Sequence, residues 1–152
     1  MASPVFTIDL SGDKELIRAL KKLPAVVERR IFRKAFRVGA KRIKEQAKAT
    51  VPVLTGALRD SIKVRAPKKR IRNAVRVIVS SSATDVLNQG DQYYGGFLEL
   101  GFKHWISGEK IDDPFLRPAF EEVAPQVERD VIQKIKTELP KEARKLALKV
   151  IK

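Results

Sequence analysis

The fold of this chain is decided by residues 24–49, which read PAVVERRIFRKAFRVGAKRIKEQAKA. Because successive residues of a helix are about 100° apart, the apolar side chains of this stretch gather on one side of a helix. Pro24 suits the first turn, where N–H groups have no partner inside the helix. We therefore predict a long central helix that ends near Ala49. Its apolar side is formed by Phe32, Phe36, Gly39, Ala40, Ile43 and Ala47, with Ile31, Ala35 and Val38 beside them.

The opposite side of the central helix is basic. Since the outward side of most amphipathic helices is charged, the simplest interpretation is a solvated surface. The functional alternative is a surface that meets phosphate or an acidic neighbour. No Asn, Gln or aromatic side chain lies among these cations, so contact with DNA would be limited to backbone phosphate. The basic face consists of Arg30, Lys34, Arg37, Lys41, Lys44 and Lys48, and Lys68, Lys69 and Arg70 form a basic hairpin tip.

Strands and a shorter helix are predicted around the central helix. Residues 5–10 alternate loosely between apolar and polar and indicate a first strand, and residues 13–23 carry apolar side chains at helical spacing. After the central helix, residues 61–66 and 71–81 alternate as strands do. We expect these two strands to form an antiparallel hairpin.

The last part of the chain contains two predicted loops and a long helix. Residues 80–92 are polar and residues 102–113 show no periodicity, so both are expected to be loops. Pro114 precedes a helix that Pro125 would kink or split. A further helix is expected over 141–152. The predicted fold is α+β, with a small antiparallel β-sheet packed against the long central helix and the C-terminal helix.

Composition narrows the class of protein. With 152 residues, of which 43% are hydrophobic and 33% charged, the chain suits one domain over residues 1–152. No apolar run approaches the roughly 18 residues of a membrane span, so no membrane partner is expected. The absence of cysteine excludes a disulfide framework and a thiolate metal site. The formal net charge of +14 makes nucleic acid a partner to consider.

Residues typical of a catalytic or metal site are few. His104 is the only histidine, and the sequence shows no second group that would orient it as a base. Asp112 and Asp113 precede Pro114 and suit a helix cap at least as well as an acidic site. We therefore expect no catalytic, cofactor-binding or metal site. A small nuclease or toxin would need a carboxylate site drawn from Asp85, Asp91, Glu99, Asp112 and Asp113, whose spacing is not diagnostic.

Three stretches carry recognisable motifs: VPVLTGALRDSI at 51–62, YGGFLELG at 94–101 and PFLRPAFE at 114–121. In order and separation they resemble the neck, or head-tail connector, family of long-tailed phages, which includes tail-completion and minor tail proteins. The second stretch departs from the family pattern, because the threonine that often follows it is replaced by Phe102. The matching residues are Pro52, Thr55, Gly56, Leu58, Arg59, Ser61, Tyr94, Phe97, Glu99, Gly101, Pro114, Phe115, Pro118 and Ala119.

The motif residues also have a local physical interpretation. Thr55 and Gly56 suit a tight turn, in which glycine allows a left-handed backbone. Arg59 could pair with Glu99 and hold the first two motifs together. Fold maintenance is the simpler explanation for the motifs, and framing a contact between subunits is the functional one.

The resemblance implies a structural virion protein that is made and assembled in the host cytoplasm. Copies would close into a ring, with six as the expected number, at the head-tail junction. The ring would lie between the head-completion or connector protein and the tail terminator or tail tube protein, and DNA would pass non-specifically through its lumen. The alternative is a basic nucleic-acid-binding protein that acts through the 30–48 helix and the 65–76 hairpin.

The contact between copies is expected to be heterologous, so that one surface meets a different surface of the next copy. The two predicted loops, 80–92 and 102–113, are the candidate elements. Aromatic side chains are frequent anchors of such interfaces. The candidate interface residues are Tyr93, Phe102, His104 and Trp105.

Overall fold

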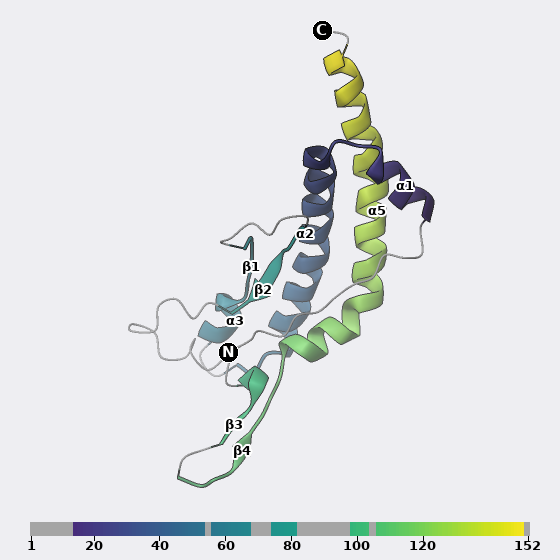
Figure 1. Ribbon diagram of the computed structural model, residues 1–152. Coiled ribbons are helices and arrows are strands. Elements are labelled where there is room, and N and C mark those ends of the chain that lie inside the picture. Colours follow the sequence, from purple (N-terminus) through teal and green to yellow (C-terminus); the bar gives the residue numbers. More distant parts are fainter. Residues whose placement is uncertain (1–13, 54–55, 68–73, 82–97, 104–105, 151–152) are drawn as a thin grey trace.

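The computed structural model describes residues 14–53, 56–67, 74–81, 98–103 and 106–150 (Figure 1). The strand expected over residues 5–10 lies outside these ranges. The elements are α1 (Lys14–Lys21), α2 (Ala25–Thr50), α3 (Ala57–Ser61), β1 (Lys63–Arg65), β2 (Ile78–Ser80), β3 (Phe102–Lys103), β4 (Lys110–Ile111) and α5 (Leu116–Val150).

Two long antiparallel helices, α2 and α5, form the body of the molecule (Figure 1). The predicted central helix is confirmed, and its boundaries differ from the prediction by one residue at each end. Ile31, Ala35 and Ala47 are its most deeply buried side chains. Ala47 lies on the predicted apolar side and Ile31 and Ala35 lie at its edge, whereas Phe32 and Phe36 are only partly buried. The main core contains Leu20, Val27, Ile31, Ala35, Val123, Val127, Val131 and Ile135.

The two long helices approach each other closely at Gly39. A Cβ atom at this position would lie 2.7 Å from Val127 Cγ1 and 3.1 Å from Val131 Cγ2. The first distance is shorter than a normal van der Waals contact, so only the hydrogen of glycine fits between the helices without a shift. Alanine has a higher intrinsic helix propensity than glycine, and the close packing between the two helices explains why glycine occupies this position.

A two-stranded antiparallel sheet packs against α2. Lys63 of β1 is opposite Ser80 of β2, and Val64 is opposite Val79. Val79 is partly buried against a second core cluster, which contains residues of α2, α3 and α5. The antiparallel pairing of the predicted hairpin is confirmed, but its strands are shorter than the predicted 61–66 and 71–81, since Ser61 belongs to α3 and residues 74–77 are not strand. The α+β fold, with a small sheet packed against the central and C-terminal helices, is confirmed.

The C-terminal helix is longer than the sequence predicts. Residues 141–150, where a further helix was expected, are helical but continue α5 without a break. Both Pro125 and Pro140 lie inside α5. Figure 1 shows that the first turns of α5 are bent away from the rest of the helix, as a proline inside a helix predicts.

Two short elements were missed at the sequence level. α3 follows α2 closely and spans only five residues, so it has no helical periodicity to detect. The region 102–113, predicted as a loop, contains the antiparallel pair β3–β4, with Phe102 opposite Ile111. We call residues 102–111 the arm. Figure 1 shows the arm extending away from the helical body.

Candidate functional site

The three motif stretches meet in the second core cluster, at the end of α2. Leu58 and Ile62 come from the first motif, Leu98 packs against them from the second, and Phe115 and Ala119 come from the third. Phe115 and Ala119 are 1% and 0% exposed, so the third motif is anchored in the interior. The motif residues described here thus maintain the fold and hold the base of the arm. The members of the cluster are Ala47, Val51, Leu58, Ile62, Phe115 and Ala119.

The turn of the first motif has the predicted backbone. Gly56 has a φ of 83°, which lies in the left-handed region, and it directly precedes α3. A side chain at this position would be strained because of its positive φ. Ser61 Oγ, which is buried, donates a hydrogen bond of 2.7 Å to the carbonyl oxygen of Leu58. Thr55 lies outside the described residues.

Glu99 of the second motif caps the helix of the third motif. Its Oε2 accepts hydrogen bonds from the backbone N–H groups of Phe115 (3.0 Å) and Leu116 (2.8 Å), and its Oε1 accepts one from Arg117 (3.0 Å). Pro118 has no N–H, so this single carboxylate satisfies the first turn of α5. A negative charge is also favoured there by the helix dipole.

Two predictions about the motif contacts are therefore wrong. Glu99 accepts hydrogen bonds from backbone N–H groups and not from Arg59, whose Nε instead lies 3.7 Å from Asp60 Oδ1. The cap of α5 is also supplied by Glu99 and not by the aspartates that precede Pro114. Asp112 Oδ2 accepts a 2.6 Å hydrogen bond from Lys110 Nζ.

The arm carries part of the predicted interface. Its strands contact chiefly each other among the described elements. Ile106, near the tip, is 71% exposed, and Leu100, just before the arm, is 46% exposed. Phe102 lies in β3, as the strand bounds show. The other predicted interface residues, Tyr93, His104 and Trp105, lie outside the described residues, as do Tyr94 and Phe97 of the second motif.

The basic face predicted on the central helix is divided by the structure into paired and unpaired cations. Arg30 Nη1 lies 3.3 Å from Glu142 Oε2, and Lys34 Nζ lies 2.7 Å from Glu138 Oε2. These two side chains join α2 to α5, so they do not form part of a free outward surface. The hairpin-tip residues Lys68, Lys69 and Arg70 lie outside the described residues.

The acidic partners of these cations were missed at the sequence level. Glu138 is 6% exposed, and the hydrogen bond from Lys34, followed by that from Lys134, lowers the pKa of its carboxyl to about 2. Burial raises the pKa of Glu142, but hydrogen bonds from Lys34 and Lys145 outweigh it, so the pKa lies below its ordinary value. The i,i+4 spacing of the two glutamates on one helix was the available signal.

We predict that this cluster makes stability depend on pH. The pKa of Glu138 is about 2 in the folded chain against an ordinary 4.5, so its contribution to the free energy of unfolding is complete above pH 4.5 and is lost as the pH falls towards 2. Urea unfolding at a series of pH values should show a smaller acid-induced loss of stability for Glu138→Gln than for the wild type. The control variant, Glu121→Gln at an exposed position of α5, should keep the wild-type profile. Identical profiles for Glu138→Gln and the wild type would contradict this assignment.

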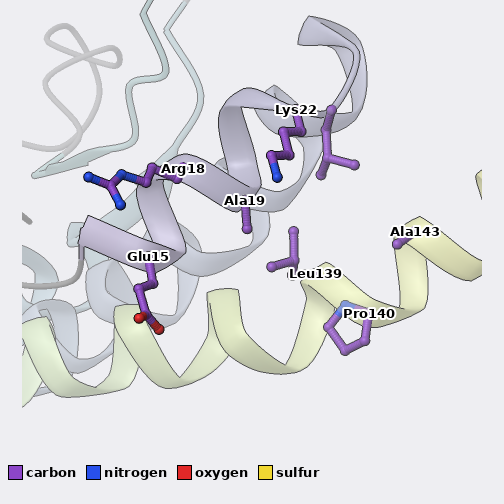
Figure 2. A pocket seen from close by; sticks show the side chains of 8 residues that line it. Glu15, Arg18, Ala19, Lys22, Leu139, Pro140 and Ala143 are labelled. Atoms are coloured by element: carbon purple, nitrogen blue, oxygen red, sulfur yellow. The ribbon is translucent and has the colours of Figure 1, made fainter.

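A shallow groove lies between α1 and α5 (Figure 2). Leu139, Pro140 and Ala143 come from α5, and the charged side chains of Glu15 and Arg18 come from α1. These groups do not form an acid–base pair or a nucleophile with its base. Within the described parts of the chain, no three acidic or histidine side chains are grouped as they would be around a metal ion. No helix there is long and apolar enough to cross a membrane.

Residues 14–101, more than half of the chain, match the family model described as "Bacteriophage HK97-gp10, putative tail-component". The chain belongs to this family. The HK97-gp10-like match covers α1, α2, the first hairpin and the first two motifs, and ends where the arm begins. No curated protein and no solved structure matches the chain.

Membership of the HK97-gp10-like family confirms the resemblance to phage neck and tail proteins. The family consists of structural tail components, so the chain is a structural protein of the virion. The buried motif residues agree with a structural role, because Glu99, Phe115 and Ala119 hold elements of the fold together.

Proposed function

We propose that this HK97-gp10-like protein forms a homo-oligomeric ring at the head-tail junction, with six copies as the expected number. The ring joins the head-completion or connector protein to the tail terminator or tail tube protein, and DNA passes through its lumen. The family match supports a tail component, and the arm is the structural observation that supports assembly.

The arm has the properties of an assembly element. A two-stranded hairpin is marginally stable by itself in water. The arm extends away from the helical body, its strands contact chiefly each other, and Ile106 exposes 71% of its surface. A second copy that covered Ile106 would bury this apolar side chain and stabilise the arm.

The geometry of the arm suits a heterologous interface. An element that projects from one end of the subunit meets a different surface on its neighbour, and such contacts generate a ring when the rotation closes. Phe102, His104 and Trp105 lie within the arm sequence, and Tyr93 precedes it. We propose that these side chains contribute to the same contact.

We expect Ile106→Asp to prevent ring assembly, because it places a charge on the apolar tip of the arm. Purified full-length protein is examined by sedimentation velocity and electron microscopy, and the variant is tested for complementation of a phage that lacks the gene. Trp105→Ala is tested in the same way and should weaken assembly.

The matched control is Val26→Asp. Val26 is 70% exposed, but it lies in the first turn of α2, where a negative charge is tolerated. This variant should assemble and complement normally. Normal rings from both Ile106→Asp and Trp105→Ala would overturn the role of the arm, and a wild-type protein that is monomeric inside the virion would overturn the ring itself.

A further inference from the structure

Four cations form an unpaired row on α2. Arg33, Arg37 and Lys41 are exposed, Lys44 is half-buried, and none of the four has an acidic partner among the described residues. Their spacing of three or four residues places all of them on one face of the helix. With a rise of 1.5 Å per residue, the row is about 17 Å long. We call these four residues the α2 stripe.

Other cations of α2 do have acidic partners. Lys34 is paired with α5, and Arg42 Nε lies 2.6 Å from Asp130 Oδ2. Lys48 Nζ lies 3.7 Å from Oδ1 of Asp60, which belongs to the first motif. Most of these acidic groups come from α5. Like charges three or four residues apart on a helix repel each other, so an external anion would stabilise the stripe.

The charge balance of the chain identifies the kind of anion. The chain has 32 basic and 18 acidic residues, with a net charge of +14. A second copy as a whole brings the same positive excess, so its net charge does not favour contact with a row of four cations. Double-stranded DNA carries one negative charge per about 1.7 Å of helix axis, so about ten phosphate charges lie along a row of this length, which is more than four cations need.

We propose that the α2 stripe binds the phosphate backbone of DNA without reading its sequence. None of the four side chains is an amide or an aromatic group, and Gln46, the nearest amide on α2, is hydrogen-bonded to Glu122. Contacts to phosphate alone position a protein on DNA but do not select bases. This proposal rests on the ring proposed above, in which the stripe faces the lumen.

The experiment measures binding of a mixed-sequence DNA duplex to the purified full-length protein by fluorescence anisotropy, between about 50 and 200 mM salt. The stripe variant carries Arg33→Gln, Arg37→Gln, Lys41→Gln and Lys44→Gln. Each phosphate contact contributes about 0.9 to the slope of log K against log salt, so loss of four contacts should reduce the slope by about 3.6 per protomer.

A control variant removes the same charge from other exposed positions: Lys14→Gln, Lys21→Gln, Arg129→Gln and Arg144→Gln. Its salt slope should equal that of the wild type. An equal loss of slope in both variants would overturn the proposal, because binding would then depend on net charge alone. Absence of binding by the wild type near physiological salt would overturn it as well, because the stripe would then make no contact with DNA.

Ring assembly is measured on the same variants by sedimentation velocity, which separates this inference from the proposed function. A stripe variant that no longer assembles, beside a control that does, would show that the stripe contacts another copy and would overturn the DNA contact. A slope change in a protein that never forms rings would support the DNA contact while rejecting the ring.

Discussion

Replacement of Glu99 by alanine is expected to lower the free energy of unfolding by about 3 kcal/mol. The variant leaves the N–H groups of Phe115, Leu116 and Arg117 without their acceptor, at a residue that is only 7% exposed. Loss of an N-cap costs up to about 2 kcal/mol, and hydrogen bonds to a charged group contribute more than neutral ones. Urea unfolding followed by circular dichroism, at one fixed protein concentration, measures the difference.

The conservative variant separates charge from shape. Glu99→Gln keeps the length of the side chain, but its NH2 group would face a backbone donor and the charge at the helix N-terminus would be lost. We expect it to be destabilised by about 2 kcal/mol. Glu121→Ala, at an exposed position of α5, should change stability by less than about 0.5 kcal/mol. Wild-type stability of Glu99→Gln would mean that the charged cap contributes little.

Replacement of Gly39 is expected to reverse the usual effect of removing a glycine from a helix. In an isolated helix, Gly→Ala stabilises by about 1 kcal/mol. Here the added methyl group would lie 2.7 Å from Val127 Cγ1, and Val127 is itself 1% exposed, so it has little room to move. We expect Gly39→Ala to lower the free energy of unfolding by about 1 to 3 kcal/mol, and Gly39→Leu by more.

A double-mutant cycle identifies the clash as the cause. Val127→Ala removes the atom that the new methyl group would meet, at the cost of a smaller core side chain. The double variant, Gly39→Ala with Val127→Ala, should therefore be less destabilised than the sum of the two single variants, with a coupling energy of about 1 kcal/mol. Additive effects, or a stabilised Gly39→Ala, would show that α2 and α5 are not in close contact here.

The expected loss of stability at Glu99 also bears on assembly. Glu99 lies three residues before the arm, and its hydrogen bonds connect this segment to the helix that follows the arm. The backbone N–H of Asp113 donates a hydrogen bond to the carbonyl oxygen of Leu98, which closes the base of the arm. Cap variants should therefore combine lower stability with weaker ring formation, whereas Ile106→Asp should affect ring formation alone.

The sequence by itself determined the elements with a strong local period. The central helix is recognisable because apolar residues recur with the helical period over 26 residues, and the α+β arrangement followed from the strands and helices around it. The motif stretches indicated the family, because a motif depends on which residue occupies each position and not on a periodic pattern. Short elements escaped detection, because α3 and the strands of the arm span only two to five residues and show no period.

The tertiary structure alone decided which partner each charged group has. The helical period places Lys34 and Arg37 on the same basic side, but only the position of α5 decides that Lys34 meets Glu138 while Arg37 does not. Glu99 was recognised as a motif residue, yet its role depends on the start of a helix 17 residues later in the chain. Such pairings arise from packing between distant segments, and a local pattern carries no information about which segments will meet.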